Sequence, residues 1–261
     1  MPLNPNYTSK APDENGIYSY SPEEHGVWKD LFTRQIAYLQ DHACQAYLDG
    51  VARLGLSALH VPQVTSLDAK LAELTGAGVK GVAALIPQDE FSTLLSNRKF
   101  PVATFIRTRE DMEYLEEPDI FHEVFGHSPM LTNEPFCQFM ERFGALALNL
   151  PKEHLKHLFR LFWFTIEFGM IRENGALKAF GAGIMSSPSE AEYATSGEAE
   201  MVEFDLMTVL RTPYRIDIVQ PVYFVIDSFE QLVDTLDQDI EAAIVAAKAA
   251  GDLPARFDLV A

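Results

Sequence analysis

Apolar side chains recur along most of the chain at the spacing of one helix face. The first such segment places Trp28 and Leu31 after Ser21, Pro22 and Glu24, which supply an N-cap, an N1 proline and a capping-box glutamate. It predicts a helix from about residue 22 to residue 54. Similar patterns predict helices over residues 62–76, 87–96, 118–126, 132–151, 152–171 and 228–251, and a segment helical in pieces over 186–210.

Strand patterns are few and short. Runs rich in β-branched and aromatic residues predict strands over residues 101–106, 215–219 and 222–226. Asn174-Gly175, between two apolar runs, is the turn signal of a β-hairpin. The sum is one mainly α domain with a few short strands (α+β) over residues 17–261, preceded by a loose, proline-containing arm over residues 1–16.

Composition narrows the setting of this domain. The chain has 261 residues, of which 48% are hydrophobic, so it can bury a substantial core. Its net charge of -18 disfavours binding to nucleic acid and to anionic membranes. No apolar run approaches the roughly 20 residues that a membrane helix needs. Cys44 and Cys137 stand apart without a CxxC spacing, which favours free thiols in a reducing cytoplasm.

His122 and His127 are the first candidates for chemistry. They resemble the HExxH pair of zinc peptidases, but they are five residues apart instead of four. On a regular α-helix this spacing turns the two side chains about 140° apart. Both can reach one metal ion only if the helix ends or bulges between them, and Gly126 would permit that change. Two ordinary core or surface histidines are the alternative interpretation.

Glu167 is the second candidate, because it lies in the apolar run 158–170. Burying this carboxylate unpaired would cost several kcal/mol, so a cation is expected beside it. Arg160, seven residues earlier, could be that cation. A metal ion is the other possibility, since two histidines and one carboxylate form the facial triad of non-heme iron(II) oxygenases. The surrounding aromatic residues would then line a dry pocket for an aromatic ring.

Arg107, at the end of the expected strand 101–106, is followed twelve residues later by Asp119. Arginine suits two-pronged binding of a carboxylate. Arg107 could therefore hold the carboxylate of a substrate while Asp119 orients the guanidinium. An ordinary salt bridge between these two residues explains the pattern equally well.

Taken in order, these and other motifs resemble the pterin-dependent aromatic amino acid hydroxylases, most closely the short bacterial members that act on phenylalanine. The resemblance covers about residues 18–230. The motifs that carry it are residues 20–25 with Trp28, 101–107, 118–127, 163–169, 181–188 and 220–223. Each alone could arise by chance, whereas the ordered set is specific to the family. The resemblance implies the single-domain catalytic fold of these enzymes.

The resemblance also implies roles around a metal. His122, His127 and Glu167 would be the ligands of iron(II) and the centre of catalysis. Ser186 would support one of the histidines and the end of the substrate, and Glu190 would lie behind these groups. The reaction implied is hydroxylation of L-phenylalanine to L-tyrosine with O₂ and tetrahydrobiopterin or a related tetrahydropterin.

Further roles concern the two organic ligands. Phe91 would stack on the pterin ring, and Glu123 would reach the pterin through water. Arg107, supported by Asp119, would bind the carboxylate of the amino acid. Three residues complete the substrate site by resemblance: Trp163 would pack on its ring, Ser186 would contact its polar end, and Ile216 favours phenylalanine over tyrosine.

Three alternatives remain at this point. Another aromatic amino acid such as tryptophan, or another ring position, could be hydroxylated. A zinc hydrolase would use Glu123 as its general base and need no O₂. A non-catalytic binding protein would be expected to have lost a ligand or the arginine, and neither is missing. We expect a monomer whose partners are small molecules.

Overall fold

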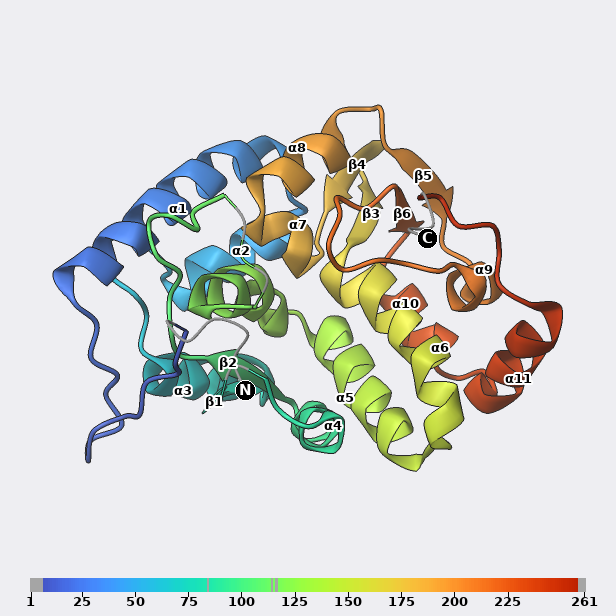
Figure 1. The fold of residues 1–261 in the computed structure, drawn as a ribbon, viewed down its shortest axis with the longest axis horizontal. Coiled ribbons are helices and arrows are strands. Elements are labelled where there is room, and N and C mark those ends of the chain that lie inside the picture. Colours follow the sequence, from blue (N-terminus) through green and yellow to red (C-terminus); the bar gives the residue numbers. More distant parts are fainter. Residues whose placement is uncertain (1–6, 84, 114, 116, 258–261) are drawn as a thin grey trace.

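Twenty short elements build the fold of the computed structural model, which describes residues 7–83, 85–113, 115 and 117–257 (Figure 1). The α-helices are α1 (Pro22–His42), α2 (Gln45–Leu54), α3 (Val64–Thr75), α4 (Gln88–Ser96), α5 (Glu134–Asn149), α6 (Lys152–Phe162), α7 (Ala182–Ser186), α8 (Pro188–Thr195), α9 (Leu206–Arg211), α10 (Phe229–Thr235) and α11 (Ile240–Ala250). The π-helices η1 (Phe121–His127) and η3 (Trp163–Glu167) and the 3₁₀-helix η2 (Ser128–Thr132) interrupt this series. The mainly helical fold with a few short strands is thereby confirmed.

Two small sheets lie apart in Figure 1, β1 and β2 at the lower left and the others at the upper right. Strands β1 (Gly78–Val82) and β2 (Lys99–Ala103) pair in parallel. The second sheet has the order β4-β3-β6-β5, formed by β3 (Gly169–Glu173), β4 (Ala176–Ala179), β5 (Glu200–Glu203) and β6 (Val222–Ile226). The β3–β4 hairpin was predicted from Asn174-Gly175, and both residues have the positive φ angles, 51° and 79°, that this turn needs.

Several expected elements differ because distant parts of the chain compete with local propensity. The helix expected over 22–54 breaks where Cys44 donates its backbone N–H to Ala179 at 2.9 Å, at a bridge between Ala43 and Ala179. The last helix divides into α10 and α11, with Asp239 capping the second. The strand expected over 215–219 is absent. The helical continuation expected over 168–171 is also absent, because residues 169–171 belong to β3.

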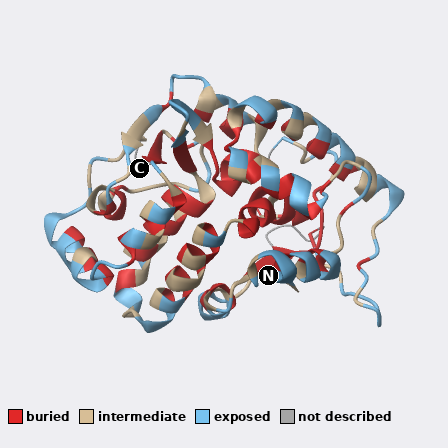
Figure 2. Cartoon of the chain, turned by 180° about the vertical axis from the view of Figure 1, so that it is seen from behind, coloured by how far each residue is buried: buried red, intermediate tan, exposed pale blue. Residues whose placement is uncertain are grey.

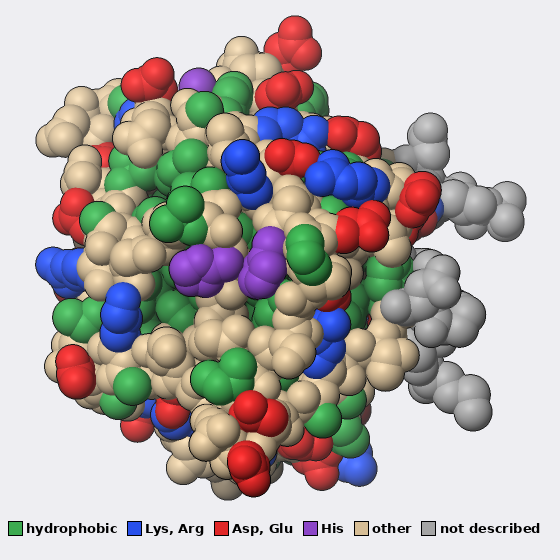
Figure 3. All heavy atoms as spheres, turned by 90° about the vertical axis from the view of Figure 1, so that its left-hand side faces the viewer, with side chains coloured by type: hydrophobic (Ala, Val, Ile, Leu, Met, Phe, Trp, Pro, Cys, Tyr) green, Lys and Arg blue, Asp and Glu red, His purple; other side chains and the backbone are tan. Residues whose placement is uncertain are grey.

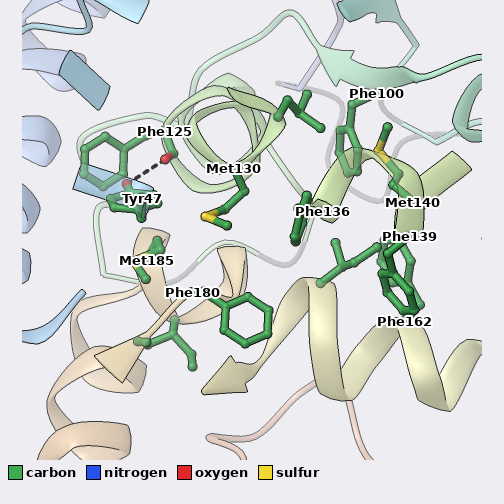
Figure 4. Packing of buried hydrophobic residues seen from close by; sticks show 14 of the residues in the cluster. Tyr47, Phe100, Phe125, Met130, Phe136, Phe139, Met140, Phe162, Phe180 and Met185 are labelled. Carbon is green, nitrogen blue, oxygen red and sulfur yellow. Dashed lines mark hydrogen bonds between the residues drawn. The ribbon is translucent and has the colours of Figure 1, made fainter. Parts of the chain in front are cut away.

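Aromatic side chains from distant segments form the centre of the core (Figure 4). Phe121 and Phe125 of η1 stack with their centroids 4.7 Å apart, and Trp28 of α1 meets Phe121 edge-on at 5.5 Å. The Tyr47 hydroxyl of α2 donates to the Phe125 carbonyl at 2.7 Å. This packing from two helices holds η1 in the middle of the fold, where the buried residues gather in Figure 2.

The described part of the N-terminal arm lies against the first sheet. Tyr7 is buried, stacks on Phe105 at 5.0 Å and donates its hydroxyl to Asp111. Ser9 donates to the Val82 carbonyl at 2.9 Å. Residues 1–6 lie outside the described ranges, and the expected boundary between arm and domain stays a prediction.

The surface carries charged side chains of both signs (Figure 3). Acidic and basic side chains are interspersed on the face seen in Figure 3. None of the helices in the described ranges is long and apolar enough to cross a membrane.

Candidate active site

A π-helix resolves the five-residue spacing of the two histidines. The segment η1 carries His122 and His127, and its i→i+5 hydrogen-bonding pattern gives it a wider turn than an α-helix. Residues five apart therefore meet on one side. The two Nε2 atoms lie 3.2 Å apart, and the ring centroids are separated by 4.9 Å. The bend that sequence reasoning required is distributed over the whole segment.

Local contacts explain why the chain adopts this wider turn. Asp119 Oδ1 accepts the backbone N–H of His122 at 3.1 Å, so it caps the start of η1. Near its end, a Cβ on Gly126 would lie 2.9 Å from the carbonyl oxygen of Ala182. A glycine is therefore needed where η1 packs on the start of α7.

Glu167 brings a carboxylate to the same point. It ends the second π-helix, η3, and its Oε1 lies 3.2 Å from His127 Nε2 while its Oε2 lies 3.6 Å from His122 Nε2. The alternative pairing with Arg160 is wrong. That guanidinium binds both oxygens of Asp252 at 2.7 and 2.8 Å.

The tautomer of His122 points a lone pair at this cluster. The Ser186 hydroxyl donates to the Ala182 carbonyl at 2.9 Å, so its oxygen is left to accept from His122 Nδ1 at 2.8 Å. Nδ1 then carries the hydrogen and Nε2 is free to bind. Burial lowers the pKa of His122 to about 4, which keeps the imidazole neutral near pH 7.

Two imidazoles and a carboxylate in this arrangement fit a divalent cation. The three donor groups face one another within 3.2–3.6 Å, and a cation between them would pair with the buried carboxylate. The donor set of two nitrogens and one carboxylate oxygen is the one used by non-heme iron(II). The hydrogen bond from His122 to Ser186 orients the ring, as such contacts do around bound metals.

Glu123 is a second carboxylate near the histidines, and it differs from Glu167 in its distance to His127 and in the direction of its pKa shift. Its Oε2 lies 3.9 Å from His127 Nε2, farther than the Glu167 oxygen. Burial and the neighbouring carboxylates raise the pKa of Glu123 well above its usual value, whereas the facing imidazoles outweigh burial and lower that of Glu167. Distance and the direction of these shifts both favour Glu167 as the anionic ligand.

Arg107 and Asp119 form a buried, two-pronged ion pair. Nε and Nη2 of Arg107 each donate to one oxygen of Asp119 at 2.9 Å, and the backbone N–H of Arg107 donates as well. Burial raises the pKa of Asp119, but the charge and hydrogen bonds of Arg107 outweigh it and lower the pKa overall. Arg107 also lines a cavity, so the salt bridge and a ligand-binding role are compatible.

This first cavity has a volume of about 800 Å³ and opens beside His122 and Glu167. Four of the five residues that we predicted for the substrate border it: Arg107, Trp163, Ser186 and Ile216. His122 and Glu167 border it as well, as does Glu190, which we predicted to lie behind the substrate and metal groups. Asp119 lies behind Arg107 instead. Ile216 is 71% exposed, which places it at the rim and not at the base of the cavity.

Gln220 organises one wall of this cavity, and sequence reasoning assigned it no role. Its Oε1 accepts from Trp163 Nε1 at 2.9 Å, while its Nε2 donates to the carbonyls of Arg215 and Ile218, each at 2.9 Å. The carbonyls of the expected strand are thus taken by a side chain, which explains why residues 215–219 form a loop. Its place in a family motif was the only signal available.

Glu190 supports the same wall from behind. Its Oε1 accepts the Gln220 backbone N–H at 3.0 Å and the Tyr223 hydroxyl at 2.6 Å. Burial raises the pKa of Glu190 to about 7, against the hydrogen bonds that favour its charged form. Trp163 in turn stacks on Tyr214 with centroids 4.4 Å apart.

A second cavity, of about 570 Å³, adjoins the first, and Leu85 and Pro118 line both. Phe91 and Glu123, the residues that we predicted for the pterin, both line it. Phe91 packs edge-on against Phe162 with centroids 5.5 Å apart. His122 and Glu167 thus border the first cavity, and Glu123, the neighbour of His122, borders the second.

Comparison with known proteins agrees with this arrangement. The family model described as biopterin-dependent aromatic amino acid hydroxylase matches residues 6–244. The chain is 45% identical over 238 residues to a phenylalanine-4-hydroxylase of Pseudomonas aeruginosa, a match that covers 91% of each protein.

Solved structures give the same result. The apo cold-active phenylalanine hydroxylase of Colwellia psychrerythraea superposes with a TM-score of 0.92 at 46% identity, covering 95% of this chain and 97% of that one. The enzyme of Chromobacterium violaceum with bound oxidised Fe(III) superposes with a TM-score of 0.88 at 38% identity, covering 96% and 94%. The chain belongs to the biopterin-dependent aromatic amino acid hydroxylases.

Proposed function

We propose that this chain hydroxylates L-phenylalanine to L-tyrosine with O₂, and that His122, His127 and Glu167 hold the iron(II) it requires. The observation that carries the proposal is the convergence of three ligand groups within 3.6 Å beside the first of two adjoining cavities. One cavity suits the amino acid and the other suits the tetrahydropterin. The relatives named above are phenylalanine hydroxylases, which supports this choice of substrate.

The chain's own residues bind and orient the two organic ligands. Arg107, held in place by Asp119, binds the substrate carboxylate in the first cavity, because its guanidinium is already desolvated and oriented. Trp163, fixed by Tyr214 and Gln220, offers a flat wall to the phenyl ring. Iron(II) and the tetrahydropterin, when bound, supply the activation of O₂.

The second cavity has the features of a site for a flat, polar heterocycle. Phe91 offers an aromatic face, and the buried Glu123, whose pKa burial raises, offers a carboxyl group to the polar edge of the ring. Its Oε2 lies farther from His127 than the Glu167 oxygen does. Glu123 is therefore a pterin-positioning group in this proposal and not a third metal ligand.

The zinc hydrolase alternative is not favoured. It needs two histidines on an α-helical turn with Glu123 as the base beside a metal-bound water. Here the histidines meet across a π-helix, and the carboxylate oxygen of Glu167 lies 3.2 Å from His127 Nε2, closer than that of Glu123 at 3.9 Å. Membership of the hydroxylase family points the same way.

A product assay tests the proposal directly. The purified protein would be incubated with iron(II), tetrahydrobiopterin and O₂, with phenylalanine, tyrosine and tryptophan in parallel reactions. We expect tyrosine from phenylalanine, dependent on both iron and pterin. The variant Glu167→Ala should form no product and bind iron more weakly, and full activity in that variant would refute the ligand set. The expected monomer and cytoplasmic location stay predictions.

A further inference from the structure

A cationic stripe borders the cavity that we assign to the pterin. Lys152, Leu155, Lys156 and Phe159 of α6 all line it. Their spacing of 0, 3, 4 and 7 residues places them along one face of the helix. Leu155 and Phe159 are partly buried, whereas both lysines are exposed. The stripe therefore runs from an apolar interior to a charged mouth.

The charge of this cavity is opposite to that of the whole chain. The sequence holds 38 acidic and 20 basic residues, yet the lining of this cavity has two lysines, Lys152 and Lys156, and one carboxyl group, that of Glu123. Glu123 is buried and lies 3.9 Å from His127 Nε2, at the inner end of the cavity, whereas both lysines are exposed. Two positive charges thus face the mouth of the cavity, apart from the one carboxyl group among the described lining residues.

Neighbouring groups leave these lysines available. Within the described ranges, neither lysine lies within 4.0 Å of a carboxylate oxygen in an ion pair. Asp252, which is near enough to be influenced by Lys156, is bound by Arg160 through both oxygens. Lys152 is also the first residue of α6, where the unpaired backbone N–H groups add positive potential.

We propose that Lys152 and Lys156 bind an acidic group, a phosphate or a carboxylate, on the side chain of the tetrahydropterin that this enzyme uses. This inference rests on the proposed function, because it assumes that the second cavity holds the pterin. The ring would lie between Phe91 and Glu123, and the substituent would extend along α6 to the mouth. A volume of about 570 Å³ is in the range that holds ligands larger than a bare ring system.

The size of the effect follows from the exposure of the lysines. Exposed ion pairs are individually weak, so two lysines acting together on one acidic group should change Kd by roughly tenfold. Because the pairs are exposed, raising the salt concentration from about 0.05 M to 0.5 M should remove most of the preference.

Direct binding measurements test the proposal apart from catalysis. Calorimetry on the iron-loaded enzyme would give Kd for three unreactive 7,8-dihydropterins: dihydrobiopterin, dihydroneopterin 3′-monophosphate and dihydrofolate. The first has an uncharged side chain, the second ends in a phosphate and the third ends in the carboxylates of glutamate. We expect at least one acidic pterin to bind roughly tenfold more tightly than dihydrobiopterin, and the tighter of the two identifies the acidic group.

Two double variants provide the contrast. In Lys152→Gln/Lys156→Gln the preference for the acidic pterin should disappear, whereas the matched control Lys29→Gln/Lys80→Gln, at exposed lysines outside the cavity, should keep it. Equal Kd values for all three pterins, or a preference that survives in the first variant, would overturn the inference. Tyrosine formation with tetrahydrobiopterin would then leave the proposed function standing, while its absence with every pterin would be a failure of that function instead.

Discussion

Removing the Ser186 hydroxyl should weaken iron binding without touching a metal ligand. In Ser186→Ala, His122 Nδ1 loses the acceptor that lies 2.8 Å away, and the Ala182 carbonyl loses its donor at 2.9 Å. An unsatisfied buried donor costs about 1–3 kcal/mol. The imidazole can also rotate or change tautomer, which would turn the Nε2 lone pair away from the metal.

That cost converts to an expected range for the metal affinity. Because 1.4 kcal/mol corresponds to tenfold, about 1–3 kcal/mol means a roughly 5- to 150-fold weaker Kd. Substitutions of groups that orient a metal-bound histidine typically cost about 10- to 100-fold, which agrees. We therefore expect the Kd for iron(II) to rise by roughly 10- to 100-fold in Ser186→Ala.

This Kd can be measured by titrating the apoprotein anaerobically with iron(II) in a calorimeter. Ser189→Ala is the matched control, because Ser189 borders the same cavity and has its hydroxyl 3.3 Å from Ser187 Oγ. It should bind iron like the parent protein. A Kd for Ser186→Ala within about threefold of the parent would refute the reasoning, since a lost orienting bond should cost more than that.

Three further predictions follow from buried polar contacts of the substrate cavity. Arg107→Ala leaves the Asp119 carboxylate buried and unpaired, so the free energy of unfolding should fall by about 3–5 kcal/mol. The KM for phenylalanine should also rise by orders of magnitude. An unchanged KM in steady-state assays would place the substrate carboxylate elsewhere. The pKa of Glu190, about 7, lies above the usual 4.5, so ionisation of this residue does not reduce the free energy of unfolding below about pH 4.5, reduces it increasingly up to pH 7, and reduces it by about 3 kcal/mol above that. Glu190→Gln should therefore become more stable relative to the parent as pH rises through this window. Denaturant titrations at about pH 5 and pH 8 that gave the same difference between variant and parent would contradict this. Gln220→Leu and Trp163→Phe each remove one end of the same 2.9 Å hydrogen bond. The effect of the double variant on the KM for phenylalanine, expressed as a free energy, should therefore be about 1 kcal/mol smaller than the sum of the two single effects. Additive effects would show that Gln220 does not act through the indole.

Local chemistry made several elements readable from the sequence alone. Ser21 and Glu24 form the reciprocal capping box that begins α1, and Asn174-Gly175 adopts the positive φ angles of a hairpin turn. Ser228 caps α10 by accepting from the backbone N–H of Gln231. Each of these signals acts over four residues or fewer, so the surrounding fold has little influence on it.

Other elements were decided by partners distant in the sequence. Pairing with Ala179 interrupts the helix at Ala43, and the Gln220 side chain takes the carbonyls that a strand over 215–219 would have used. The strand β1, with the sequence Gly-Val-Lys-Gly-Val, has no strong strand pattern of its own and forms by pairing with β2. Competition of this kind cannot be seen in a single segment.

The candidate site divides in the same way. The residue types of His122, His127 and Glu167, and the family motifs around them, predict the metal chemistry from the sequence alone. Their spacing left open whether they could meet, because an α-helix would turn the two histidines about 140° apart. Only the tertiary structure decided this: Asp119 caps η1 and Gly126 packs on Ala182, and these contacts stabilise a π-helical turn that local propensity would not favour.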